Sequence, residues 1–170
     1  HSDRTLFPVG SIKNKSGEYY KVFGAFKQVC YEYLDRQQKI KTLDQPSPQQ
    51  KLNIDSDEIP QSISGFEKVD ENLTSQWPVG EDVAWSKLES FVKDHIQHYQ
   101  TQRDFPAIDG TSQLSPYLNA GILSIRQCLQ LIQHRYQNQL FASDNGVHTW
   151  LDELLWREFY QHILYGFPQI

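Results

Sequence analysis

Residues 150–160 place side chains that could do chemistry beside others that only pack. If this stretch is helical, successive residues are turned by roughly 100°, and one side collects apolar side chains. These are Leu151, Leu155, Phe159 and Ile163. A neighbouring arc collects indoles, a carboxylate, a guanidinium and a phenol, which are Trp150, Glu153, Trp156, Arg157 and Tyr160. Stability gives a core helix no reason to gather aromatic and charged groups in this way, so the arc predicts a site.

The spacing alone leaves a simpler interpretation of this arc open. Glu153 and Arg157 stand four residues apart, as in an ordinary helical ion pair flanked by packed indoles. Such a pair contributes about 0.3 to 0.5 kcal/mol when exposed and needs no ligand.

A hydroxyl-rich turn is the second candidate site. Thr111, Ser112 and Ser115 lie between Gly110 and Pro116, ahead of a helical segment. Hydroxyls and free backbone N–H groups at a helix start can converge on a phosphate, and the helix dipole adds a favourable field. The same residue types are also ordinary helix caps, so both interpretations remain open for this turn.

Helices are the elements expected to position these groups. Apolar periodicity predicts a helix over residues 19–34, whose aromatic stripe with Phe23 is expected to be core, a second beyond Pro78 that ends before Pro106, and a third from Ser124. A further helix, the last in the chain, is expected to be capped by Thr149. Ser124 with Gln127 matches the capping box, and Thr149 with Asp152 resembles it. A turn is expected at 144–146, a loop over 1–18, and no convincing strand run appears.

Composition limits the classes of protein. The 170 residues are 38% hydrophobic with a net charge of −5, so a real core is possible and any contact with DNA must be local. Two distant cysteines and scattered histidines indicate neither a disulfide framework nor a metal site. We expect a cytoplasmic protein, without membrane or metal partners, because a membrane span and a signal peptide are both missing. Its oligomeric state is not predicted.

The pattern from residue 150, W-L-x-E-L-x-W-R-E-F-Y-x-H, closely resembles the flavin- and DNA-proximal helix of the photolyase and cryptochrome family. Residues 99–106, 110–118 and 121–127 extend the resemblance in the order and rough spacing of class I pyrimidine-dimer photolyases. Residues 20–26 only approximate the family's Y-x-V-F-T-P-F. The resemblance covers nearly the whole chain and is specific from Trp77 onward.

The resemblance implies a mainly α-helical fragment. Residues 1–34 would end the α/β antenna-binding domain, residues 35–77 would be the interdomain linker, and residues 78–170 would begin the FAD-binding helical domain. It also implies FAD as cofactor, with a folate or deazaflavin antenna chromophore in the full-length protein. The implied flavin-binding residues are Tyr99, Thr111, Ser112, Gln113, Leu114, Ser115, Trp150 and Arg157. The family usually has arginine where Gln113 stands, so we expect weaker flavin binding.

The implied partner is DNA that contains pyrimidine dimers. Arg103 would meet a phosphate or base edge, and the contacting run would be Glu153, Leu154, Leu155, Trp156, Arg157, Glu158, Phe159 and Tyr160. Glu153 and Trp156 would be catalytic. An indole can stack on a flipped base, and a protonated carboxyl group can donate to a carbonyl that gains negative charge.

By implication the protein is a deoxyribodipyrimidine photo-lyase, in which light-excited reduced flavin donates an electron to the dimer, the ring splits and the electron returns. A cryptochrome-like photosensor that signals through a protein partner, and a helical interaction module, are the alternatives. Retention of Glu153 and Trp156 favours repair. We expect the 170 residues alone neither to hold FAD tightly nor to repair DNA.

Overall fold

The structure, a computed structural model, describes residues 4–36, 40, 42, 47–48, 50, 53–55, 57–58, 60, 62–67, 70–136 and 146–170. Within these ranges the regular elements are helices, and β-structure is limited to one isolated antiparallel bridge between Lys13 and Tyr19. The prediction of a mainly α-helical chain is therefore confirmed. The chain divides into two units, one made of residues 1–42 with 80–170 and the other of residues 43–79.

The smaller unit covers most of the predicted linker, and its described residues form one short helix, α2 (Glu71–Gln76). The Asp70 carboxylate caps α2 by accepting a hydrogen bond from the Asn72 backbone N–H at 2.7 Å. Such side-chain caps satisfy one of the donors that a helix start leaves free. The sequence analysis expected no element here, so α2 is an addition to it. Assignment of residues 1–34, 35–77 and 78–170 to domains remains a prediction.

Helix α1 (Phe23–Arg36) confirms the first predicted helix, although it begins four residues later than expected. Phe26, Cys30 and Leu34 of α1 are buried, as their spacing of four residues predicts. The segment before α1 has no helix in residues 4–22, in agreement with the expected loop. That loop nevertheless contributes to the core, because Leu6 and Phe7 are buried.

The second predicted helix is an irregular rod made of four elements in succession. These are α3 (Glu81–Ser90), a π-helix η1 (Phe91–His95), a 3-10 helix η2 (Ile96–His98) and α4 (Tyr99–Gln102). The rod ends before Pro106, as predicted. The Val92 carbonyl of η1 accepts a hydrogen bond from the Tyr136 hydroxyl at 3.2 Å, which ties η1 to α6 (Ile125–Tyr136).

The start of α6 confirms the predicted capping box. The Ser124 backbone N–H donates to Gln127 Oε1 at 2.8 Å, and the Gln127 backbone N–H donates to Ser124 Oγ at 3.2 Å. Before it, the short helix α5 (Ser115–Ala120) ends at Gly121, whose φ of 75° is the left-handed conformation that favours glycine after a helix. The predicted turn at 144–146 falls largely outside the described residues, because Asp144 and Asn145 are not described.

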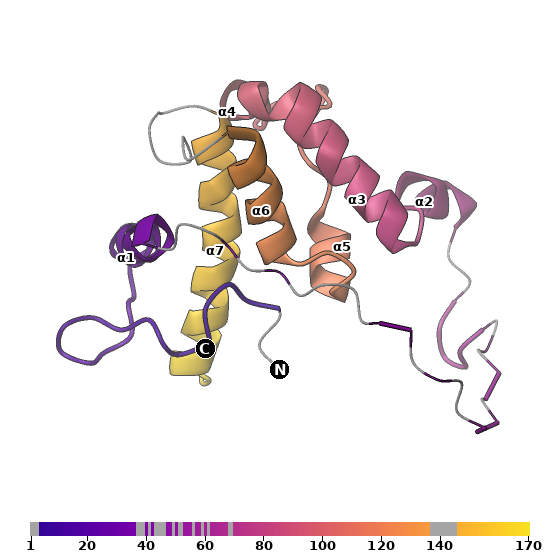
Figure 1. Cartoon of the computed structure of the whole chain (residues 1–170), viewed down its shortest axis with the longest axis horizontal. Coiled ribbons are helices and arrows are strands. Elements are labelled where there is room, and N and C mark those ends of the chain that lie inside the picture. Colours follow the sequence, from indigo (N-terminus) through magenta and orange to yellow (C-terminus); the bar gives the residue numbers. More distant parts are fainter. Residues whose placement is uncertain are drawn as a thin grey trace. The chain divides into compact units, whose positions relative to one another are not determined.

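The central element is α7 (Gly146–Gly166), a helix of 21 residues that contacts α1, α4, η2 and α6 (Figure 1). Because α7 begins at Gly146, Thr149 lies inside it, and the predicted Thr149 cap is wrong. Gly146 is pressed against η2: a Cβ atom there would overlap the Ile96 carbonyl oxygen and lie 2.8 Å from the carbonyl carbon of Gln97. This close approach fixes where α7 starts relative to the rod.

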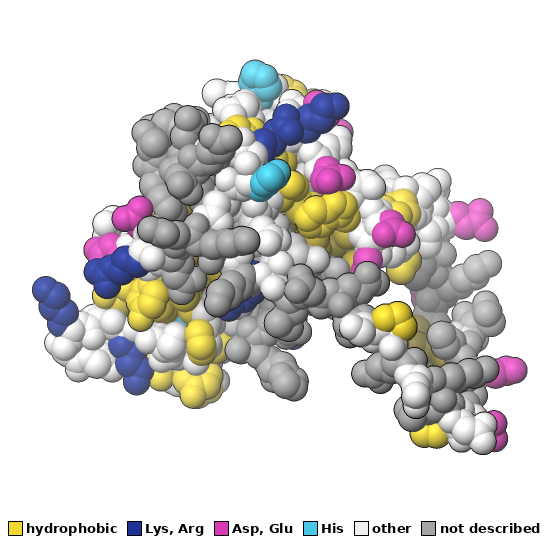
Figure 2. All heavy atoms as spheres, in the orientation of Figure 1, with side chains coloured by type: hydrophobic (Ala, Val, Ile, Leu, Met, Phe, Trp, Pro, Cys, Tyr) yellow, Lys and Arg dark blue, Asp and Glu magenta, His cyan; other side chains and the backbone are white. Residues whose placement is uncertain are grey.

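The surface carries charges of both signs. On the face shown in Figure 2, the described lysine and arginine side chains lie in separate places and do not merge into one continuous basic patch. This distribution agrees with the expectation that any DNA contact is local. None of the described helices is long and apolar enough to cross a membrane.

Candidate functional site

The exposed side of α7 carries three of the residues that the sequence analysis grouped together. Glu153 and Trp156 are partly buried and Tyr160 is 57% exposed, whereas Leu151 and Leu155 on the other side are fully buried. Phe159 is also buried, so the predicted packing face is confirmed. The helix therefore presents a carboxylate, an indole and a phenol on one open face.

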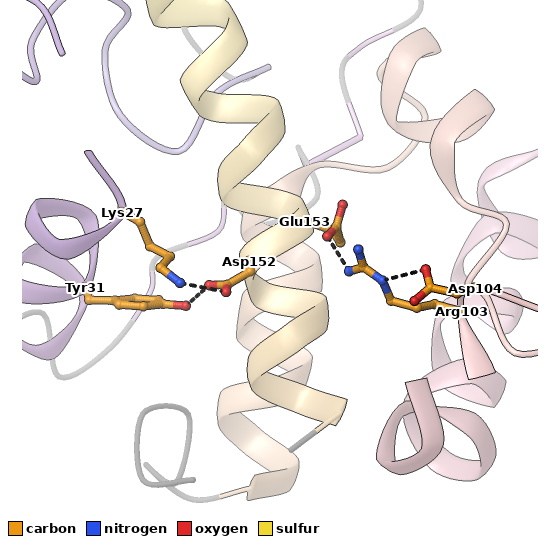
Figure 3. A network of polar contacts seen from close by, with 6 residues as sticks. All are labelled: Lys27, Tyr31, Arg103, Asp104, Asp152 and Glu153. Carbon is orange, nitrogen blue, oxygen red and sulfur yellow. Dashed lines mark hydrogen bonds and ion pairs between the residues drawn. The ribbon is translucent and has the colours of Figure 1, made fainter. Parts of the chain in front are cut away.

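Arg103 joins this face from the rod. It follows α4 directly, and its guanidinium forms an ion pair with the Glu153 carboxylate and lies 3.5 Å from Asp104 (Figure 3). The guanidinium also lies over the Tyr99 ring, 5.8 Å from its centre, so Tyr99 and Arg103 share a helix face. The hydrogen bond to Glu153 raises the pKa of Arg103 above its ordinary value, so the guanidinium stays charged.

Trp156 lies inside an aromatic group. The Phe23 ring of α1 stacks on the indole, with ring centres 3.7 Å apart and planes 13° apart. Tyr160 lies 5.6 Å from the indole at 26°, and Phe159 meets it edge-on. Phe23 is partly buried against the hydrophobic core, and its ring also reaches the edge of the candidate site.

Asp152 projects from α7 away from Glu153 and binds α1 (Figure 3). Its carboxylate accepts hydrogen bonds from the Lys27 ammonium at 2.8 Å and from the Tyr31 hydroxyl. The Tyr31 hydroxyl also lies 3.4 Å from His148 Nε2. Burial, followed by the bond to Asp152, raises the pKa of Tyr31 well above its ordinary value, so Tyr31 remains a neutral donor. Two adjacent carboxylates of α7 thus bind different elements.

Trp150 and Arg157 lie outside the open face. Trp150 is buried against Phe91, with ring centres 5.0 Å apart. The Arg157 guanidinium donates to the backbone carbonyls of Arg4 at 2.7 Å and Leu118 at 3.1 Å. Of the run expected to meet DNA, four side chains are buried, namely Leu154, Leu155, Glu158 and Phe159.

Glu158 has a structural partner that the sequence analysis missed. Its fully buried carboxylate accepts hydrogen bonds from the backbone N–H groups of Leu6 at 2.7 Å and Phe7 at 3.4 Å. Burial raises the pKa of Glu158 to about 7 even though these donors and the nearby Arg157 and Arg126 favour the charged form. Glu158 therefore holds the loop before α1 against α7. No sequence pattern could have found a contact between residues so far apart in the chain.

The hydroxyl-rich turn borders a cavity of about 110 Å³. Its lining combines Thr111, Ser112 and Gln113 with polar and aromatic side chains from α3, η1 and the preceding loop, namely Lys87, Ser90, Phe91, His95 and Asp109. Three hydroxyls, of Ser90, Thr111 and Ser112, and the Lys87 ammonium at one small cavity suit a phosphate group. The residue that caps α5 is Leu114, without a side-chain hydrogen bond, so Thr111 and Ser112 do not serve as its caps.

Gln113 adopts an uncommon backbone conformation with φ of 52°. Its side-chain amide donates a hydrogen bond to Asp109 Oδ1 at 2.9 Å. A neutral amide thus stands beside a carboxylate at the rim of the cavity. Leu114 is buried, and Ser115 is exposed at the first turn of α5.

The described residues include no group of three His, Cys, Asp or Glu side chains that could hold a metal ion. Cys30 and Cys128 are both free and buried.

Comparison with known proteins links this geometry to one family. No protein-family profile matches the chain. It is 35% identical over 99% of its length to the deoxyribodipyrimidine photo-lyase of Escherichia coli strain K12 and 38% identical, again over 99%, to that of Buchnera aphidicola from Acyrthosiphon pisum. A class III photolyase of Agrobacterium tumefaciens is similar in structure over 98% of this chain, with a TM-score of 0.67 and 26% identity. The chain spans 34% of each of these proteins, about a third of their length.

Proposed function

Because this chain belongs to the family of deoxyribodipyrimidine photo-lyases, we propose that it forms part of a flavin-dependent enzyme that splits cyclobutane pyrimidine dimers in DNA under light. The observation that carries the proposal is the open face of α7, which presents Glu153 and Trp156 and where Arg103 from the end of the rod pairs with Glu153. A carboxyl group, an indole and a guanidinium are the types of group that we propose recognise a flipped dimer.

Each of these three residues has a distinct proposed role at the dimer. Photolyases take the target nucleotide out of the base stack. The Trp156 indole would then stack on the flipped pyrimidine, and the Glu153 carboxyl group, in its protonated form, would donate a hydrogen bond to a pyrimidine carbonyl that gains negative charge. Arg103 would bind a phosphate next to the dimer, since a guanidinium matches a phosphate in shape and charge. Tyr160, exposed on the same face, would complete the DNA-contacting surface.

The flavin would be held at the hydroxyl-rich turn and the adjoining part of the rod. Thr111, Ser112 and the backbone of Gln113 to Ser115 would bind its pyrophosphate, which fits the donors around the cavity. When bound, reduced FAD would supply the light-excited electron that opens the dimer. Tyr99 is buried, and burial raises the pKa of its phenol, so it would remain a neutral hydrogen-bond donor.

Trp150 and Arg157 would form structural walls of the flavin site. Trp150 would form its wall by packing against Phe91. Arg157 would do so by donating hydrogen bonds to the carbonyl groups of Arg4 and Leu118. We place the buried side chains of the α7 run, such as Leu155 and Glu158, behind the DNA surface as support. The assignment of residues 1–34 to an antenna domain, 35–77 to a linker and 78–170 to the flavin domain is part of the same proposal, as is an antenna chromophore of folate or deazaflavin type.

The test is dimer repair by the full-length protein with Trp156→Ala. The protein would be loaded with FAD, mixed with an oligonucleotide that contains a thymine dimer and illuminated with near-ultraviolet or blue light. We expect the wild type to restore intact thymines and the variant to lose affinity for the dimer while it retains flavin. Unchanged repair and DNA affinity in the variant would refute the assignment of Trp156. Retained flavin without repair by the wild type would indicate a photosensor.

A further inference from the structure

The contact between α1 and α7 is ordered in a regular register. Phe23, Lys27 and Tyr31 stand four residues apart and so share one face of α1. On α7, Asp152 and Trp156 also stand four residues apart. Phe23 meets Trp156, whereas Lys27 and Tyr31 meet Asp152. The two helices therefore present matched faces to each other.

Lys27 connects the polar and aromatic halves of this contact. Its ammonium is 2.8 Å from Asp152 and lies 5.7 Å from the centre of the Phe23 ring and 5.8 Å from the centre of the Tyr31 ring. Both partners of the ion pair are mostly buried, with side-chain exposures of 28% and 20%. A partly buried charge that is hydrogen-bonded and flanked by rings restricts sliding of one helix along the other. This arrangement fixes the position of Phe23 along the axis of α7.

Phe23 in turn limits what the Trp156 indole can do. An indole has two faces on which a base can stack, and the Phe23 ring covers one of them at 3.7 Å. Phe23 also meets Phe159 at 5.9 Å in an edge-on contact, so its own position is set by the packing face of α7. A flipped base would use the face opposite Phe23, and the exposed Tyr160 ring, whose centre lies 5.6 Å from that of the indole with planes 26° apart, would border the base there.

We propose that Phe23 is a positioning residue for dimer recognition: it covers one face of Trp156, holds the indole plane, and directs the flipped pyrimidine to the other face. This inference rests on the proposed function and adds to it a contribution from α1, outside the rod and α7. Phe23 acts through Trp156 and does not itself touch the dimer.

The experiment compares Phe23→Ala, Phe23→Leu and Phe23→Tyr in the full-length, flavin-loaded protein. Tyr33→Ala is the matched control, since Tyr33 is also an aromatic residue of α1 but lies 48% exposed and contacts Phe7 instead of Trp156. Affinities for the same oligonucleotide with and without a thymine dimer are measured by fluorescence anisotropy. Flavin absorbance after desalting shows whether each variant keeps its cofactor.

We expect Phe23→Ala and Phe23→Leu to lower the affinity for the dimer about threefold to tenfold, the range that loss of one aromatic pair implies. Affinity for undamaged DNA should stay the same, and Phe23→Tyr and Tyr33→Ala should match the wild type. If Phe23→Ala fails to fold or loses flavin, Phe23→Leu decides the result, because leucine keeps most of the volume without the flat ring.

A spectroscopic readout separates positioning from a purely structural role. Stacking on Phe23 places the Trp156 indole in an asymmetric environment that contributes to near-ultraviolet circular dichroism. That contribution is the difference between the wild type and Trp156→Phe, and it should be reduced when Phe23 is alanine or leucine. Unchanged dimer preference in both variants, with Trp156→Ala impaired, would overturn the role of Phe23 and leave the proposed function intact. A wild type that neither prefers nor repairs dimers would instead refute the proposed function.

Discussion

Arg103 and Glu153 form an ion pair across the contact between α4 and α7, with 32% and 37% of their side chains exposed. Both residues are proposed to bind DNA, one at a phosphate and the other at the dimer. In the structure each is the other's partner. DNA must therefore compete with an internal contact, and the pair lies where solvent and a phosphate can reach it.

Glu153→Gln is expected to raise the affinity for undamaged DNA while it weakens repair. The change removes a negative charge and frees Arg103, so a phosphate no longer has to displace the carboxylate. Because an exposed ion pair contributes at most about 1 kcal/mol, the gain should be no more than about fivefold at low salt. Anisotropy with undamaged and dimer-containing oligonucleotides at two salt concentrations measures it. Asp104→Asn, which removes the longer contact of Arg103, is the control. Weaker binding of undamaged DNA by Glu153→Gln would contradict the competition between Glu153 and phosphate for Arg103.

Gln113→Arg is expected to strengthen flavin retention. The Gln113 amide now donates to Asp109 at 2.9 Å beside the cavity lined by Thr111 and Ser112. Arginine would keep that contact as an ion pair and bring positive charge to the rim, which favours a bound pyrophosphate. Flavin absorbance of the full-length protein after desalting is the measurement. Gln113→Ala serves as the control, and equal flavin content in all three proteins would show that this position does not affect binding.

The free energy of unfolding should depend on pH through Glu158. Burial raises its pKa to about 7, from 4.5, so between these values the folded protein binds a proton that the unfolded chain does not. Stability is then fully present below about pH 4.5 and falls as the pH rises toward 7, by at most roughly 3 kcal/mol. Glu158→Gln lacks this titration and keeps an oxygen that can accept from Leu6. Urea unfolding of both proteins at pH 5 and pH 8 tests the prediction, and a constant difference between them would contradict it.

Cys30 and Cys128 are expected to resist thiol reagents in the folded protein. Burial raises the pKa of both thiols, to about 12 for Cys128, and the thiolate is the reactive form. At pH 8 a maleimide should label neither residue in the time that it labels both in urea. Mass spectrometry gives the number of maleimide labels on each protein molecule. Rapid labelling of either cysteine under native conditions would show that α1 or α6 opens readily.

Local patterns in the sequence were reliable where the contacts are local. Ser124 and Gln127 form the predicted capping box because both partners belong to one helix turn. The similar spacing of Thr149 and Asp152 failed, because the tight packing of Gly146 starts α7 earlier and Asp152 binds Lys27 and Tyr31 of α1. Both pairs have the spacing of a capping box, and tertiary contacts determined that only the first pair forms one.

Contacts between distant residues could not be predicted from periodicity. Glu158 lies on α7, 152 residues from Leu6, and no pattern in either segment predicts their hydrogen bond. Periodicity likewise placed Phe23 in the core stripe of α1 but could not show that its ring reaches Trp156. The open face of α7 was predictable because helical spacing alone brings Glu153, Trp156 and Tyr160 to one side.

The absence of a side chain at Gly146 determines how closely α7 approaches the rod, and therefore how Arg103 and Glu153 are placed. Arg103 and Glu153 belong to different elements, and the distance between those elements is determined where the first residue of α7 meets the backbone of Ile96 and Gln97. A single added methyl group would act as a wedge at that point and tilt or shift α7 against the rod. At this position the packing leaves room for glycine alone.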